Sequence, residues 1–268
     1  MDPILVTGGT GTLGRHVVRR LVDGGHGVRV LTRQHRREQE EGVRFVTGDL
    51  LTGEGVEAAV DGVATIVHCA GSSKGDEVAT QHLVDAARRV GRPHLVFISV
   101  VGAERMPVHS GVDRLMFRYF DMKRKAELVV ERSGLPWTTL RATQFHDLVL
   151  FVLEKLAKLP VVPTPSGVSF QPVDADEVAE RMVELALGPP AGLAPDIAGP
   201  RVYPTAVLIR SYLAATHRRR ALLPIRLPGG AAGALRSGAN LPLGGTVGRR
   251  TWEAFLAERV PHSMTAGG

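Results

Sequence analysis

The stretch Ile4-Leu5-Val6-Thr7-Gly8-Gly9-Thr10-Gly11-Thr12-Leu13-Gly14, near the start of the chain, decides the fold. Its first residues are apolar and partly β-branched, a pattern typical of a buried strand. The residues that follow, 15–22, carry valines and a leucine at helical spacing with polar residues between them. A strand, a tight glycine turn and a helix in this order form a cradle for a pyrophosphate, because the helix N-terminus offers free N–H groups and a partial positive charge.

The three glycines of this motif have different expected roles. Gly8 permits the turn, Gly11 lets the backbone come close to a ligand, and Gly14 lets the helix pack closely on the strand. A glycine-rich turn in an α/β protein without a nucleotide is the alternative. The strand and the helix that flank the turn favour a dinucleotide site.

The rest of the first half repeats strand and helix regularly. Residues 27–33, 43–47, 64–68, 94–99 and 135–141 read as strands, with helices predicted over 54–60, 77–90 and 112–133. This alternation predicts an α/β fold, a Rossmann-type doubly wound parallel sheet with helices on both faces. We expect residues 1–145 to form the dinucleotide-binding Rossmann core and residues 146–268 to form a smaller C-terminal region that packs on the same domain and covers the substrate.

The end of the second predicted strand indicates which nicotinamide coenzyme is bound. An acidic residue at this point would hold the ribose hydroxyls of NAD. The sequence instead has Thr32 and Arg33, followed by Arg36 and Arg37. A guanidinium can hold a 2′-phosphate, which a carboxylate would repel. We therefore expect NADP(H), with a solvated arginine cluster as the alternative.

A possible catalytic pair lies on the long helix predicted over 112–133. Tyr119 and Lys123 are four residues apart, so they share one helix face. An ammonium beside a phenol lowers the phenol pKa, which would make Tyr119 a usable proton donor. An ordinary surface pair on an amphipathic helix has the same spacing.

The order of these motifs resembles the short-chain dehydrogenase/reductase superfamily, specifically its atypical, NmrA-like branch. The resemblance rests on an ordered set of motifs: the glycine motif, Leu31-Thr32-Arg33, Gly48-Asp49-Leu50, Ile98-Ser99-Val100-Val101-Gly102, Tyr119 to Lys123, Ser133 to Thr138 and Leu140 to Phe145. It implies that Asp49 and Leu50 flank the adenine, that Lys123 approaches the nicotinamide ribose and that Ala142 to Phe145 line the nicotinamide. The expected cofactor-binding residues are Thr7, Gly8, Thr10, Gly11, Thr12, Leu13, Gly14, Thr32, Arg33, Arg37, Asp49, Leu50, Cys69, Ala70, Gly71, Ser99, Lys123, Ala142, Gln144 and Phe145.

One departure from the family pattern concerns the expected catalytic serine. Main-line members place a serine shortly after the fifth strand, whereas this chain has Val100 and Val101 there, after Ser99. The resemblance therefore implies an NADP-dependent reductase of an apolar carbonyl, quinone or conjugated compound, with Tyr119 and Lys123 as catalytic residues. A regulatory protein that senses NADP without turnover, and a redox-neutral enzyme on the same scaffold, are the alternatives.

Composition and charge limit the other classes of function. The net charge is +6, from 33 basic and 27 acidic residues, which favours anionic ligands. The basic clusters are short and lack interleaved aromatic residues, so no nucleic-acid partner is expected. The lone cysteine, Cys69, fits a reducing compartment, and no run reaches the length of a membrane span, so we expect a cytoplasmic protein without a membrane partner. No metal-ligand spacing is present, and no metal is expected.

The second half of the chain gives weaker signals. Asp174, with Glu177 three residues later, predicts a helix start. Residues 222–245 are rich in Leu, Pro, Gly and Ala, and suggest an apolar, loop-rich wall above the nicotinamide. We expect a small-molecule substrate and a monomer or homodimer.

Overall fold

A nine-stranded sheet forms the centre of the molecule. The computed structural model describes residues 2–34, 41–71 and 75–260. The strand order is β13-β10-β6-β5-β4-β1-β2-β3, with β9 also paired to β6, and all these pairs are parallel. The six strands of the first half are β1 (Ile4–Thr7), β2 (Val28–Thr32), β3 (Val43–Thr47), β4 (Thr65–His68), β5 (His94–Val100) and β6 (Trp137–Ala142). The Rossmann-type α/β fold predicted from the sequence is confirmed.

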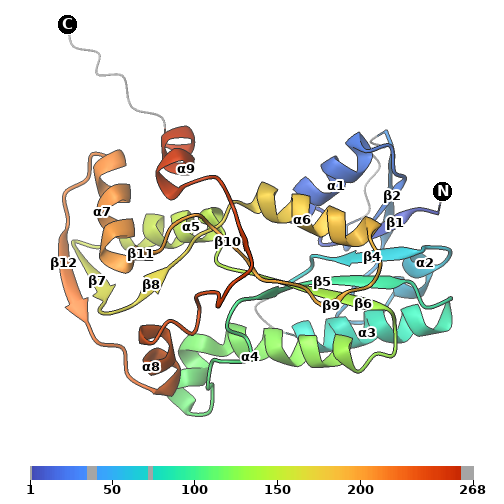
Figure 1. The fold of residues 1–268 in the computed structure, drawn as a ribbon, viewed down its shortest axis with the longest axis horizontal. Helices are drawn as coiled ribbons and strands as arrows, with labels where there is room; N and C mark the ends of the chain where they lie inside the picture. The colour runs from blue at the N-terminus through green and yellow to red at the C-terminus, as the bar shows by residue number, and fades with distance from the viewer. Residues whose placement is uncertain (1, 35–40, 72–74, 261–268) are drawn as a thin grey trace, which may run out of the picture.

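Helices cover both faces of this sheet (Figure 1). Helix α1 (Gly14–Asp23) packs beside α6 (Ala175–Leu187) on one face, where Val17, Leu21 and Met182 are fully buried. On the other face lie α2 (Val56–Val60), α3 (Asp76–Arg89) and α4 (Gly111–Glu131). The strand order reverses between β1 and β4, and in open parallel sheets ligands bind beyond the carboxyl ends of the strands at such a point.

The chain after residue 145 contributes both to this sheet and to a second layer. Strands β9 (Gly192–Leu193), β10 (Ile197–Ala198) and β13 (Thr246–Val247) extend the sheet. The remaining elements lie at the other end of the molecule: α5 (His146–Leu156), β7 (Val161–Pro165), β8 (Ser169–Phe170), β11 (Tyr203–Pro204), α7 (Thr205–Ala215), β12 (Ala221–Ile225), α8 (Gly230–Arg236) and α9 (Trp252–Arg259). The central sheet therefore continues past residue 145, the boundary expected from the sequence.

Part of the second half is more regular than its composition suggests. Residues 222–245, expected to be a loop-rich wall, contain most of β12 and all of α8. Strand β12 pairs in parallel with β7, and α8 is built of small residues whose Ala231 and Ala232 are fully buried. The small side chains let this short helix pack closely against its neighbours. A stretch rich in glycine and alanine does not by itself predict a helix, so α8 was not predicted from the sequence.

Helix α4 consists of two helical segments joined at a kink. Ser110 and Asp113 form a capping box at its start, and the backbone at Phe117 leaves helical geometry, with φ −125°. The kink lies between the exposed N-terminal turns and the part of the helix that carries Lys123 and packs on α3 and β5.

Candidate cofactor-binding site

The turn between β1 and α1 has room only for glycine at two positions. Gly8 adopts φ +68°, and a Cβ there would lie 2.6 Å from the backbone N of Ala70. A Cβ on Gly14 would collide with the carbonyl oxygen of Gly8, and the neighbour nearest to a Cβ on Gly11 would be the same oxygen, at 3.2 Å. The roles expected for Gly8 and Gly14 therefore have a direct steric reason.

The start of α1 presents donors suited to an anion. Leu13 is the N-cap residue and makes no side-chain cap. Within the described chain, no acceptor is found for the backbone N–H groups of Thr12, Leu13 and Gly14. Unpaired N–H groups at the positive end of a helix fit a diphosphate.

A series of hydrogen bonds among buried polar side chains lies beneath this turn. The Thr80 hydroxyl donates to the Asp76 carbonyl (2.7 Å), so His68 Nε2–H donates to Thr80 Oγ1 (3.2 Å). His68 Nδ1 is then free to accept from the Thr7 hydroxyl at 2.6 Å. Burial, with a smaller contribution from Lys123, lowers the pKa of His68 to about 3, so this imidazole is neutral.

Cys69 follows His68 but packs against the core on the α1 face of the sheet, whereas His68 stacks on Phe97 on the other face. Burial raises the pKa of its thiol to about 12, although Lys123 opposes the shift. A protonated thiol is a poor nucleophile. Cys69 therefore belongs to the packing beneath the loop that joins β4 to the site.

The residues after β2 lie next to the glycine turn because β1 and β2 are neighbours. Thr32 Oγ1 accepts the backbone N–H of Gln34 (3.3 Å), and Arg33 is exposed. No ion pair of Arg33 is found among the described residues. Arg36 and Arg37 lie outside the described residues.

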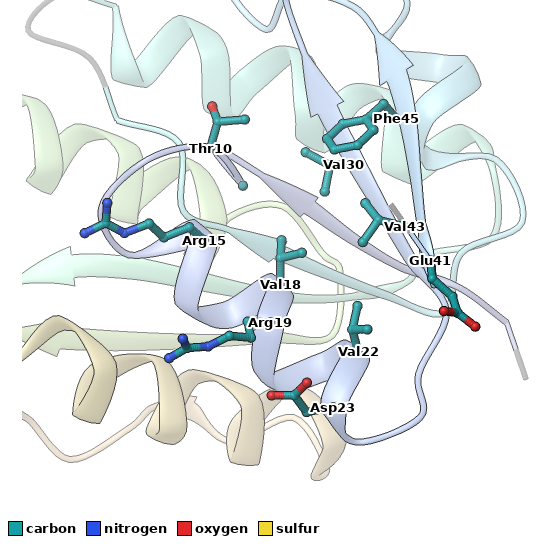
Figure 2. Close-up of a pocket in the computed structure, with 11 residues that line it drawn as sticks. Thr10, Arg15, Val18, Arg19, Val22, Asp23, Val30, Glu41, Val43 and Phe45 are labelled. Carbon is teal, nitrogen blue, oxygen red and sulfur yellow. The ribbon is translucent and has the colours of Figure 1, made fainter. Parts of the chain in front are cut away.

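A groove of about 440 Å³ runs behind the turn, between α1 and strands β2 and β3 (Figure 2). Thr10 and Arg15 line its end near the glycine turn, and Val30 and Phe45 form part of its apolar wall. It lies on the α1 face of the sheet and away from Lys123, so it borders the expected phosphate position rather than the nicotinamide position.

Asp49 and Leu50 follow β3 at the same edge. Asp49 Oδ1 accepts the backbone N–H of Leu51 at 2.8 Å, and the Leu50 carbonyl is bonded to His82 Nδ1 at 2.8 Å. These contacts hold the two residues that the resemblance places beside the adenine.

Lys123 is buried and paired with an acid that the sequence did not indicate. Its ammonium lies 3.2 Å from Asp76 Oδ2, at the first turn of α3, and 3.4 Å from the carbonyl of Ile98. It also lies 5.1 Å from the centre of the Phe97 ring. Pairing with Asp76 neutralises a charge that would otherwise be costly to bury.

Tyr119 is placed differently. It lies one turn before Lys123, just after the kink at Phe117, and its side chain is 48% exposed. No hydrogen bond between Tyr119 and Lys123 is found among the described residues, where the lysine contacts are those to Asp76 and Ile98. The pair thus shares a helix but no hydrogen bond among the described residues, and its catalytic role stays a prediction.

The end of β5 is apolar where a serine was expected. Val100 and Val101 are buried, and Ser99 lies beside Glu127, which is paired with Arg141 at 2.8 Å. Burial disfavours ionisation of Glu127, but hydrogen bonds from Arg141 and Arg124 outweigh it and keep its pKa below the ordinary value. Ser99 is buried beside this ion-pair cluster, and its hydroxyl has no hydrogen-bond partner among the described residues.

The segment after β6 joins the two halves of the molecule. Ala142 is buried beside Val100, and Phe145 is the N-cap of α5. The Gln144 carbonyl accepts the backbone N–H of Val173 (3.0 Å). These residues lie at the carboxyl end of β6, as the resemblance implies.

The parallel sheet brings the predicted site residues to one edge. Those buried are Thr7, Leu13, Gly14, Leu50, Ser99, Lys123 and Ala142; those half-buried are Gly8, Thr32, Asp49, Cys69, Ala70, Gln144 and Phe145; those exposed are Thr10, Gly11, Thr12, Arg33, Gly71 and Tyr119. Reasoning from the sequence missed His68 and Asp76. The position of Asp76 at a helix start was a usable signal, but its pairing with a lysine 47 positions away was not.

Within residues 2–34, 41–71 and 75–260, no group of three or more His, Cys, Asp or Glu side chains could hold a metal ion. None of the helices in those ranges is long and apolar enough to cross a membrane.

Relatives with similar sequences carry different names. The photosystem II assembly factor Ycf39 of Trieres chinensis is 26% identical over 190 residues, 66% of this chain and 57% of that protein. The (4-alkanoyl-5-oxo-2,5-dihydrofuran-3-yl)methyl phosphate reductase of Streptomyces griseus is 32% identical over 149 residues, 55% of this chain and 49% of that protein. The chain spans about half the length of the curated relatives that it matches.

Solved structures share the fold over nearly the whole chain. The NADPH-dependent quinone oxidoreductase of Escherichia coli, solved with NADPH, has a TM-score of 0.78 and 16% identity, and the match covers 96% of this chain and 99% of that one. UDP-glucose 4-epimerase of Thermotoga maritima has a TM-score of 0.73 and 18% identity, with 97% and 98% covered. At such identities the likeness shows the fold alone.

The family itself follows from the sequence match and the site together. The model of the NAD(P)H-binding family matches residues 8–186, which include the glycine turn, the buried Lys123 and all of helix α6 except its last residue. The structural neighbours share the fold that the resemblance implies. The chain belongs to the NAD(P)H-binding family.

Proposed function

We propose that this protein is an NADP(H)-dependent reductase of an apolar carbonyl, quinone or conjugated small molecule. The observation that carries the proposal is the pairing of an anion-binding helix start with Arg33 at the adjacent strand end, where NAD-binding sites have a carboxylate. The names of two relatives, a reductase and a quinone oxidoreductase, support this class of reaction.

Each of these residues would have a separate role in binding or catalysis. The N–H groups at the start of α1 would hold the diphosphate, and Arg33 would hold the 2′-phosphate. Lys123 would donate to the nicotinamide ribose, and Asp76 would keep its ammonium in place. When bound, the cofactor supplies the hydride. Tyr119 would supply the proton to the substrate oxygen, which completes reduction of a carbonyl to an alcohol.

A second candidate, a regulatory protein that senses NADP without turnover, also has an observation in its favour. Val100 and Val101 fill the position of the usual serine, and no hydrogen bond joins Tyr119 to Lys123 in the described chain. The relative named as an assembly factor supports it too. A redox-neutral enzyme is the third candidate, supported only by the epimerases among the structural neighbours.

The test combines binding with turnover on the purified full chain. Calorimetry should show NADPH binding at least about 10-fold more tightly than NADH, and Arg33→Glu should weaken NADPH binding about 10- to 100-fold with little effect on NADH. Arg44→Glu, which makes the same charge change near the start of β3, is the control and should leave the preference intact.

Turnover then separates the candidates. The reductase should oxidise NADPH in the presence of some member of a panel of quinones, enones and aromatic aldehydes, and Tyr119→Phe should lower kcat about 100-fold or more. Tight NADPH binding without oxidation across the panel would reject the reductase and favour the sensor. Equal binding of NADH and NADPH would reject the role given to Arg33.

A further inference from the structure

A small apolar surface with a basic rim lies at the end of the molecule formed by β7 and β12, far from β1 and β2 (Figure 1). The two strands pair in parallel, with Ala221 opposite Val161 and Leu223 opposite Pro163. Paired residues in a parallel ladder point to the same face. Leu223 is 54% exposed and Val161 is 43% exposed, so this face of the ribbon is open to solvent.

The opposite face of the ribbon explains why the strands lie there. Val162 is fully buried and packs with the core of α7 and α9, which includes Leu208 and Trp252. The alternation of side chains then turns Val161 and Pro163 outward. The ribbon is thus anchored by one apolar face and presents a second apolar face outward.

Exposed cations lie at both ends of this ribbon. Lys158 precedes β7, Arg218 and Arg219 precede β12, and Arg226 follows it; all four are exposed. None of the four makes an ion pair with an acid of the described chain. The sequence between Asp196 and Glu253 contains no acidic residue at all. We define the basic–apolar surface as Val161, Pro163, Ala221 and Leu223 with these four cations.

The size and charge of this surface limit what can cover it. Two strands of five residues present a face of roughly 16 by 10 Å, far below the roughly 800 Å² that one partner contributes to a standard protein interface. A second copy would bring its own cations against the first set. An anionic lipid surface needs no large complementary area, because apolar side chains enter the headgroup region while arginines attract the lipid phosphates.

We infer that the basic–apolar surface docks this protein on anionic membranes as a peripheral protein. The inference is independent of the proposed reaction, since it uses neither Arg33 nor Lys123. The sequence alone predicted no membrane partner because it has no continuous span, whereas this surface forms only when β7 and β12, far apart in the chain, come together.

The test measures flotation of the full chain with vesicles. Binding is expected to phosphatidylcholine vesicles that contain about a third phosphatidylglycerol, and not to pure phosphatidylcholine, and it should weaken strongly at high salt. The triple variant Arg218→Ala/Arg219→Ala/Arg226→Ala should lower the partition coefficient about 100-fold, since each cation contributes about fivefold. Leu223→Ser should lower it about tenfold.

Two matched controls separate this surface from general charge and apolar exposure. Arg44→Ala/Arg88→Ala/Arg132→Ala removes the same charge from exposed positions on the Rossmann half, and Leu243→Ser removes another exposed leucine, outside the surface. Both should bind vesicles as the parent does, and all variants should keep the parent's circular dichroism and NADPH affinity.

Three outcomes would overturn the inference. They are no flotation of the parent with anionic vesicles at low salt, equal loss of binding in both triple variants, and equal binding to neutral vesicles. If vesicles do not bind but polyglutamate does, and this binding needs the same arginines, the surface fits an acidic protein partner instead.

Discussion

The neutral state of His68 makes a prediction at the scale of a single residue. Its Nδ1 accepts a hydrogen bond from the Thr7 hydroxyl directly beneath the glycine turn, so protonation of Nδ1 would remove that hydrogen bond. Burial lowers its pKa from 6.5 to about 3, whereas in the unfolded chain it keeps its ordinary value. As the pH falls below about 6.5, the unfolded state gains a proton that the folded state does not, so stability is lost towards pH 3.

The size of this effect can be measured by urea unfolding. Between pH 7 and pH 5 the parent should lose about 2 kcal/mol of unfolding free energy more than His68→Gln does. His109→Gln, which changes an exposed histidine, should follow the parent. His16 and His94 also have lowered pKa values through burial, but they titrate alike in all three proteins. Parallel curves for the parent and His68→Gln would contradict the assignment.

Some side-chain contacts in the site could not be predicted from the spacing of residues in the sequence. The spacing of Tyr119 and Lys123 correctly placed both on one helix, but spacing does not reveal that Asp76 of α3 pairs with the lysine. Nor does it reveal the kink at Phe117. Such contacts depend on how α3 and α4 pack on β5, and only the folded chain determines that packing.

At the scale of elements, the contact between α1 and β1 depends on Gly14. Its missing Cβ leaves room for the Gly8 carbonyl, so Gly14→Ala must push the helix away from the strand. We expect about 1–3 kcal/mol of destabilisation, as for other overpacked sites, together with weaker NADPH binding because the N–H groups of α1 move. Urea unfolding and calorimetry measure the two effects.

Gly27 offers a matched control for this substitution. It lies between α1 and β2, and a Cβ there would meet no atom within 4 Å. Gly27→Ala should therefore be neutral or stabilise by about 0.5 kcal/mol, and NADPH binding should not change. If the two alanine variants had equal stability, Gly14 would not be the residue that sets the approach of α1 to β1.

The strands of the first half were predictable because each is rich in apolar and β-branched residues and lies between turn residues, although β2, β3 and β6 each contain an arginine. Strands β8, β9, β10, β11 and β13 have only two residues each, too few for any periodicity. Their positions depend on tertiary contacts such as the pairing of Ile197 with Ala142. The start of α6 was half predictable: Asp174 caps the helix, while Glu177 accepts the backbone N–H of Arg249 instead of closing a capping box.

At the scale of the whole molecule, the question is whether the two halves unfold together. Asp174, at the start of α6, pairs with Arg250 just before α9 at 2.7 Å, and the Asp174 pKa lies well below its ordinary value although burial opposes this. His146 is fully buried, with its ring centre 5.0 Å from that of Phe255. Since β9, β10 and β13 also complete the central sheet, we expect one cooperative unit.

The two tryptophans of the chain allow this to be tested, because each lies in a different half. Trp137 is in β6, and Trp252 is in α9 with its indole N–H donating to Ser211. In Trp137→Phe the fluorescence reports the second half, while far-ultraviolet circular dichroism of the same sample reports all helices. The two urea transitions should coincide, and the converse variant, Trp252→Phe, should give the same agreement through Trp137. Separated transitions would mean that residues 146–268 contain an independently folding unit, and the sheet contacts made by β10 and β13 would then be too weak to couple it to the Rossmann core.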